Sequence, residues 1–300
     1  MACLGAGTLN DIPYSSFVKA GAAIHLVDWL PGVMDFGIAH RIIEEPRAAG
    51  PQCLYCLVNN IDPRDYCCSF NRLEESGAPI CSACEISPDE PKYCVAFKKG
   101  RFPYVYHEDA TGGYASAFGT GLARALDGVT SWRQAFKRAN LLAARVRQHR
   151  SRLSIPDDSV DLVISSMLIS QFEHEPYTYF SRQAAALLGA PTAQEETRLR
   201  PTMERLRSTL LESQIERHLE EIERILAPDG RCFLAFELFH CESGENVWYL
   251  IEEMSGVLNA LARRFNFDID GCPGVIGDSE FRTNGNRSVV CHLLLAPKPQ

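Results

Sequence analysis

Short apolar runs along the chain alternate with longer segments in which apolar residues return every three or four positions. Short runs bounded by turn residues predict buried strands, whereas the longer period predicts helices with one apolar face. Strands are expected at residues 1–4, 24–28, 104–109, 161–165, 231–239, 265–270 and 288–296, and the clearest helices at 131–150, 202–226 and 245–264. Strands that alternate with helices predict an α/β chain whose mostly parallel sheet is covered on both faces.

The first strand leads straight into Gly5-Ala6-Gly7. Two glycines at this spacing let the chain turn sharply and let backbone N–H groups approach a ligand closely. The second strand ends on Asp28, and an acid about 20 residues after a glycine turn accepts hydrogen bonds from ribose hydroxyls in nucleoside-binding folds. Only residues 1–4 precede Gly5, so either the first strand is short or the natural chain begins upstream.

Turn residues set the expected boundaries in the second half of the chain. Residues 173–200 are polar and contain Pro176 and Pro191, which predicts a segment that covers a cleft. The helical pattern of 202–226 stops at Ala227-Pro-Asp-Gly230, and a strand follows. Asn284-Gly-Asn286 favours a hairpin between the last two strands.

Composition and charge exclude several classes of partner. The net charge is −8 and no basic patch stands out, so nucleic acid is not an expected partner. The basic residues of 145–152 are interpreted as the solvated face of a helix. No apolar run is long enough to span a membrane, and no secretory signal is visible. Abundant cysteine without such a signal indicates a reducing compartment, and we expect a cytoplasmic protein.

Residues 46–103 differ from the rest of the chain in their cysteine content. The segment is rich in turn residues, lacks helical periodicity and is expected to order only around a metal centre. Paired Cys-x-x-Cys units present thiolates that suit zinc or an iron–sulfur cluster, with a [4Fe–4S] cluster favoured; thiols without a metal are the remaining alternative. The candidate ligands are Cys53, Cys56, Cys67, Cys68, Cys81, Cys84 and Cys94, whereas the other cysteines are interpreted as core or surface residues.

Five pieces of sequence occur in an order that resembles the class I S-adenosylmethionine-dependent methyltransferases. They are Leu4-Gly-Ala-Gly7, Val27-Asp28, Glu108-Asp-Ala-Thr111, Ile155-Pro-Asp-Asp-Ser-Val-Asp-Leu-Val-Ile164 and Arg224-Ile-Leu-Ala-Pro-Asp-Gly-Arg231. The resemblance implies a Rossmann-like, doubly wound, seven-stranded, mostly parallel sheet. It also implies one methyltransferase domain made of residues 1–45 and 104–300, interrupted by the cysteine-rich insertion 46–103. The third glycine usual in the first motif is absent, since Leu9-Asn-Asp11 stands there.

The same resemblance implies roles for individual residues in a cofactor site. The glycines would face the methionine part of S-adenosylmethionine, Asp28 its ribose, and Asp109 its adenine, with Glu108 as the alternative acid. The cofactor-binding set is Gly5, Gly7, Asp28, Asp109, Ala110 and Ser165. Ser166 would lie near the transferred methyl group and His174 would act as a general base, although a surface histidine is an equally acceptable interpretation.

A second resemblance concerns the insertion. The stretch from Cys84 to Phe97, preceded by the pair Cys67-Cys68, is similar to the YkgJ-type cysteine clusters. That resemblance implies a zinc or iron–sulfur centre.

Three functions therefore remain open at the level of sequence. The first is a methyltransferase with a metal-bearing insertion that acts on a small molecule. The second is a non-catalytic metal- or redox-sensing module on a degenerate methyltransferase scaffold. The third is an enzyme whose vicinal Cys67-Cys68 pair binds thiol or metalloid substrates directly. The methyl acceptor and the oligomeric state do not follow from the sequence.

Overall fold

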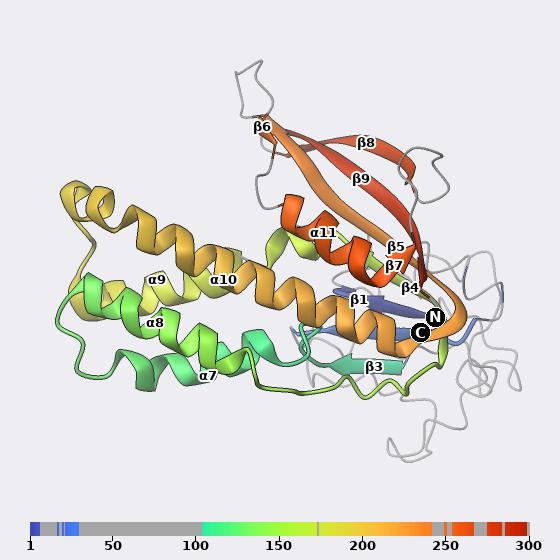
Figure 1. Cartoon of the computed structure of the whole chain (residues 1–300), viewed down its shortest axis with the longest axis horizontal. Helices are drawn as coiled ribbons and strands as arrows, with labels where there is room; N and C mark the ends of the chain where they lie inside the picture. The colour runs from blue at the N-terminus through green and yellow to red at the C-terminus, as the bar shows by residue number, and fades with distance from the viewer. Residues whose placement is uncertain are drawn as a thin grey trace, which may run out of the picture. The chain divides into compact units, whose positions relative to one another are not determined.

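A computed structural model describes residues 1–6, 17, 20, 22–29, 104–172, 174–241, 249–250, 254–266, 275–283 and 286–298 of the 300-residue chain (Figure 1). The chain divides into two compact units, residues 1–107 and 108–300. Gly7 and the cysteine-rich segment 46–103 lie outside the described residues. The prediction that this segment is a metal-binding insertion therefore stays a prediction.

The described residues of the first unit form three parallel strands. They are β1 (Ala2–Leu4), β2 (His25–Asp28) and β3 (Tyr104–His107), and β2 lies between the other two. All three residues of β1 are buried, and burial raises the pKa of the Cys3 thiol to about 12. The predicted strands are confirmed, and β1 ends at Leu4 because the turn begins at Gly5.

The second unit contains the remaining described strands. The strand β4 (Val160–Ser166) runs parallel to β5 (Leu226–Cys241), which pairs antiparallel with β9 (Asn286–Pro297). Further antiparallel pairings add β6 (Tyr249–Leu250) to β5, and add β7 (Phe265–Asn266) and β8 (Val275–Thr283) to β9. The cysteines Cys232 and Cys241 of β5 are buried, which confirms their interpretation as core residues.

The predicted hairpin forms with a different partner. Its long arm is β8, which pairs with β9 from Val275↔Leu293 to Thr283↔Asn286, whereas β7 contributes only a two-residue pairing. The β8 sequence mixes glycine and charged residues with apolar ones, so its hydrophobic pattern is too weak to mark a strand.

The described residues of the second unit form five helices. They are α7 (Tyr114–Leu126), α8 (Trp132–Val146), α9 (His174–Leu188), α10 (Ala193–Ile225) and α11 (Met254–Arg264), with a 3-10 turn at Ile169–Gln171. Figure 1 shows α7, α8 and α9 alongside the long α10, and buried residues of these four helices form one hydrophobic core. That core includes Tyr177, Phe180 and Ala184 of α9. The segment 173–200 is therefore partly a core helix and not polar throughout, and its role as a cover over a cleft stays a prediction.

The helix α10 begins nine residues earlier than the sequence pattern predicts. A capping box opens it: the Thr192 side chain accepts from the Glu195 N–H while the Glu195 carboxylate accepts from the Thr192 N–H and hydroxyl. Pro201 lies inside the helix, and a proline normally marks a helix start or break. Leu199, two residues before Pro201, is buried in the hydrophobic core, so the helix packs against the core at this point.

The architecture is an α/β, Rossmann-like fold with a mostly parallel sheet flanked by helices, as the sequence predicts. Seven described strands, β1–β5, β7 and β9, account for the predicted seven-stranded sheet, and β6 and β8 extend it at β5 and β9.

We expect Gly113→Ala to be much more destabilising than Gly128→Ala. Both glycines have left-handed backbones, with φ of 78° and 64°. A Cβ at Gly113 would lie 2.6 Å from the Ser151 Cβ, whereas a Cβ at Gly128 meets nothing within 4 Å. Strain alone costs about 1–2 kcal/mol, and the steric overlap adds about 1–3 kcal/mol at Gly113. Urea unfolding of the two variants measures the difference, and equal losses would contradict the tight packing of this turn.

Candidate functional site

The turn after β1 lies beside the carboxyl end of β2. Gly5 adopts a left-handed backbone with φ of 69°, and the N–H groups of Gly5 and Ala6 both donate to the Val27 carbonyl at 2.9 and 3.1 Å. Because Leu4 pairs with Val27, the next residues along each strand, Gly5 and Asp28, lie at the same edge. The first unit thus brings the predicted glycine turn next to the predicted ribose-binding acid.

Asp109 organises the turn that leads into α7. One carboxylate oxygen accepts from the Thr111 N–H at 2.8 Å and from the Thr111 hydroxyl. The other accepts from the N–H and the hydroxyl of Ser116, both at 2.8 Å. A carboxylate offers about four acceptor positions, so the described residues occupy all of them. The negative charge also lies at a helix N-terminus, where it is stabilising.

Most backbone N–H groups of this turn have an acceptor. Those of Gly112, Tyr114 and Ala115 donate to the Asp109 carbonyl, the Thr111 carbonyl and the Thr111 hydroxyl. Within the described part of the chain, the N–H groups of Asp109, Ala110 and Gly113 are the exceptions. Ala110 is only 8% exposed. A buried backbone donor normally has a partner, so the Ala110 N–H is suited to a ligand acceptor.

His218 of α10 joins this turn to the end of β4. Its Nδ1 lies 2.9 Å from the Ala110 carbonyl oxygen and its Nε2 lies 2.8 Å from the Ser165 hydroxyl. A carbonyl only accepts, so Nδ1 carries the proton and donates. Both His218 and Ser165 are fully buried, and the Phe172 ring packs edge-on against the imidazole.

Burial keeps His218 neutral. Loss of solvation lowers the pKa of His218 to about 4, although its bond to Ala110 and the charges of Asp109 and Glu221 act in the opposite direction. In the neutral ring Nε2 is an acceptor, so the Ser165 hydroxyl donates to it. The chain of bonds therefore runs from Ser165 through His218 to Ala110.

Two of the five sequence pieces contact each other through Arg224. Its guanidinium donates to the carbonyls of Leu153 and Ile155, and it pairs with the Asp157 carboxylate at 2.5 Å. Glu221 pairs with the same guanidinium at 2.6 Å and accepts from the Leu153 N–H at 2.9 Å. The end of α10 thereby fixes the segment that enters β4.

Glu108, the alternative acid, is also engaged inside the second unit. Its carboxylate accepts from the Ser154 N–H at 2.9 Å and from the Ser154 hydroxyl. Glu108 thus supports the loop before β4, whereas Asp109 supports the α7 turn with the more extensive set of four bonds.

The predicted catalytic residues lie beyond this network. Ser166 is the last residue of β4 and is half-buried, and His174 is the exposed first residue of α9. Within the described segments, no group of three or more His, Cys, Asp or Glu side chains could hold a metal ion. No described helix is long and apolar enough to cross a membrane.

Sequence reasoning missed His218. A signal existed, because His218 falls on the buried face of α10 between Ile215 and Ile222. A polar side chain at such a position needs a buried partner. Neither partner, Ala110 nor Ser165, is close to it in sequence.

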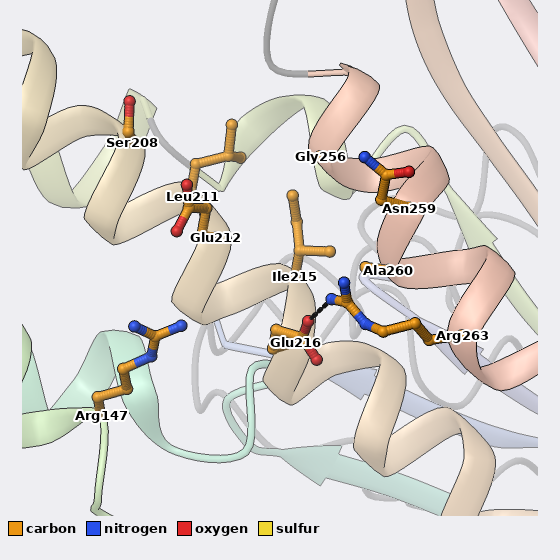
Figure 2. A pocket seen from close by; sticks show the side chains of 10 residues that line it. All are labelled: Arg147, Ser208, Leu211, Glu212, Ile215, Glu216, Gly256, Asn259, Ala260 and Arg263. Carbon is orange, nitrogen blue, oxygen red and sulfur yellow. Dashed lines mark hydrogen bonds and ion pairs between the residues drawn. The ribbon is translucent and has the colours of Figure 1, made fainter.

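A separate pocket lies between α10 and α11 (Figure 2). Its volume is about 490 Å³, and a Glu216–Arg263 ion pair crosses its rim. None of the predicted site residues lines it. Its lining residues are Arg147, Ser208, Leu211, Glu212, Ile215, Glu216, Gly256, Asn259, Ala260 and Arg263.

Comparison with known proteins gives structural likenesses only. No protein-family model matches the sequence, and no curated protein matches it. The fold is similar to that of an arsenic (III) S-adenosylmethionine methyltransferase from Chlamydomonas reinhardtii, with a TM-score of 0.36 and 11% identity over 99% of this chain and 63% of that chain. It is also similar to the PH0226 protein from Pyrococcus horikoshii OT3, with a TM-score of 0.34 and 11% identity over 99% of this chain and 82% of that chain. The chain thus spans less than two thirds of the Chlamydomonas protein, and its function must be argued from its own residues.

We expect the free energy of unfolding to decrease as the pH is lowered through the range in which His218 binds a proton in the unfolded chain but not in the folded one. The folded pKa is about 4 and the usual value is 6.5. The stabilising contribution of the neutral ring is therefore complete above pH 6.5 and is lost as the pH falls toward 4, by on the order of 3 kcal/mol.

Urea unfolding at several pH values tests this expectation. His218→Gln keeps a donor and an acceptor but does not titrate, so the variant should lack the slope of the wild type between pH 5 and 6.5. Parallel pH profiles of the two proteins would contradict a buried, neutral His218.

Proposed function

We propose that the chain is an S-adenosylmethionine-dependent methyltransferase. The observation that carries the proposal is the unpaired Ala110 N–H in a turn whose other polar groups are almost all bonded. It occurs within the Glu108–Thr111 piece that the sequence resemblance assigns to the adenine. The left-handed Gly5 beside Asp28 supports the proposal independently, because this arrangement suits a ribose.

The proposed cofactor-binding residues contact different parts of the cofactor. Gly5 and Gly7 let the backbone approach the methionine part, and Asp28 accepts from the ribose hydroxyls. The remaining members, Asp109, Ala110 and Ser165, belong to the hydrogen-bonded network of the second unit. When bound, the cofactor supplies a sulfonium methyl group, which is intrinsically reactive.

Catalysis by such a protein is mainly alignment of the acceptor with the methyl group. Ser166, at the end of β4, is proposed to orient the acceptor. His174 is proposed to remove a proton where the acceptor needs it, because its exposed imidazole can accept one. A small molecule is the favoured acceptor, since the sequence shows no basic patch for nucleic acid.

The cysteine-rich segment is proposed to fold around a metal centre. Its paired Cys-x-x-Cys units support either a [4Fe–4S] cluster or zinc, held by four of Cys53, Cys56, Cys67, Cys68, Cys81, Cys84 and Cys94. The vicinal Cys67-Cys68 pair also motivates thiols and metalloids as members of any acceptor panel.

We expect the full-length, metal-replete chain to bind S-adenosylmethionine. Asp28→Asn should weaken binding about 10- to 100-fold, because it removes charge-assisted bonds to the ribose. Asp161→Asn is the matched control, since Asp161 is an exposed acid on β4, and it should bind as the wild type does. Isothermal titration measures all three proteins. Absence of binding by the wild type would favour the non-catalytic sensing module instead.

We also expect anaerobically purified protein to contain a stoichiometric metal. Iron and sulfide with broad visible absorbance would identify a cluster, and a colourless protein that releases zinc would identify a zinc site. Cys56→Ser should lower the metal content, whereas Cys291→Ser on β9 should not. Protein that is free of both metals but folded would overturn the metal-centre proposal.

A further inference from the structure

The pocket between α10 and α11 contains none of the predicted cofactor-binding or catalytic residues (Figure 2). Its volume of about 490 Å³ is typical of small-molecule sites. Each of the two helices lines it with residues spaced three or four apart, so one face of each helix borders the pocket. These residues are Ser208, Leu211, Glu212, Ile215 and Glu216 of α10 and Gly256, Asn259, Ala260 and Arg263 of α11, and Arg147 at the end of α8 completes the lining.

The apolar part of the lining suits a ligand with an apolar body. Leu211, Ile215 and Ala260 line the pocket although only 5%, 3% and 2% of their surface is exposed, so they form a closely packed apolar floor. Gly256 leaves free space beside them, because a Cβ placed there meets nothing within 4 Å. Apolar groups of a ligand leave water when they contact this floor, and their transfer is favourable.

Two neutral side chains of the lining have hydrogen-bonding capacity to spare. Ser208 and Asn259 are both exposed, and neither side chain has a hydrogen-bond partner among the described residues. A hydroxyl and a side-chain amide each donate and accept hydrogen bonds. They therefore suit a peptide group, which also carries one donor and one acceptor.

The charged residues of the lining consist of one ion pair and two single charges. Glu216 and Arg263 pair with each other, and Glu216 also binds Arg264 at 3.1 Å. By contrast, Arg147 and Glu212 form no ion pair with each other or with any other described residue. A guanidinium and a carboxylate without partners thus line the same pocket, and each attracts the opposite charge on a ligand.

We propose that this pocket binds a small zwitterion with apolar side chains, namely a short peptide with free termini. The peptide carboxylate binds Arg147, the ammonium group binds Glu212, and the side chains lie on the apolar floor. Ser208 and Asn259 bond the peptide group, which a single amino acid lacks. Two arginines and two glutamates line the pocket, so their charges cancel and a ligand of zero net charge fits better than an anion or a cation. The inference does not depend on the proposed function.

Isothermal titration of the full-length chain with leucyl-leucine and its two capped forms tests the zwitterion. N-acetyl-leucyl-leucine lacks the ammonium group, and leucyl-leucine amide lacks the carboxylate. We expect leucyl-leucine to bind saturably and each capped form to bind at least about 5-fold more weakly, because each loses one charge-assisted bond. Absence of saturable binding by leucyl-leucine, or a capped form that binds within about 5-fold of it, would overturn the inference.

Two single variants assign the two charges of the peptide. Arg147→Gln should remove the advantage of leucyl-leucine over its amide and keep its advantage over the acetylated form, and Glu212→Gln should do the reverse. Both residues are exposed and lack an ion-pair partner among the described residues, so neither change should affect stability. A variant that leaves its own preference intact would show that the peptide charge binds elsewhere and would overturn the inference.

Gly256→Leu tests the pocket itself. The new side chain extends into open space, and leucine favours a helix more than glycine does, so the variant should fold. Because the side chain occupies the pocket, leucyl-leucine should bind at least about 10-fold more weakly.

Ala262→Leu is the matched control for Gly256→Leu. Ala262 is exposed on α11 and does not line the pocket, so this variant should bind leucyl-leucine as the wild type does. Equal binding by the two leucine variants would overturn the assignment to this pocket. If Gly256→Leu failed to fold, Arg147→Gln and Glu212→Gln would decide.

Discussion

A neutral, fully buried imidazole connects the α7 turn to the end of β4 in the second unit. His218 donates to the Ala110 carbonyl and accepts from the Ser165 hydroxyl, so one side chain of α10 links the α7 turn to the end of β4. Water cannot replace either hydrogen-bond partner of His218, because Ala110 and Ser165 are both buried. Burial also keeps the His218 imidazole uncharged. A protonated imidazole would donate from Nε2 and so reverse the direction of its hydrogen bond with the Ser165 hydroxyl. The geometry of the turn therefore depends on a single protonation state.

Two further interactions give this network a rigid frame. Asp109 closes the turn from inside with four hydrogen bonds, and Arg224 fixes the chain before β4 by binding three acceptors there. Arg224 forms an ion pair with Glu221, so the largely buried positive charge of the guanidinium has a negative partner. The end of α10 thus carries both the imidazole and the guanidinium, which explains why a helix distant in sequence shapes the loops at strand ends.

The sequence was most informative where one local pattern determines structure. The glycine turn at Gly5, the strand β4 and the helix stop before Pro228 follow from backbone freedom, apolar runs and breakers, and the structure confirms them. The start of α10 was misplaced because the capping box at Thr192 had to be weighed against Pro201. The strand β8 was missed because its apolar pattern is weak, whereas the helix α7 was missed although its buried residues Tyr114, Phe118, Leu122 and Leu126 recur every four positions.

The candidate site was predictable only in part, for a physical reason. The types and order of Gly5, Asp28, Asp109 and Ala110 indicate a nucleoside site, since each belongs to a strand end. The role of His218 depends on partners 108 and 53 residues away in the chain. No periodicity or short motif records such contacts, which become visible only once α10 is placed against the sheet.

The most direct test of the central claim is the amide resonance of Ala110 in a nuclear magnetic resonance titration with S-adenosylhomocysteine. The account predicts a large downfield shift and new protection from exchange at the Ala110 N–H, with little change at the already bonded N–H groups of Thr111 and Ser116. Saturable binding that leaves the Ala110 resonance unmoved would contradict it.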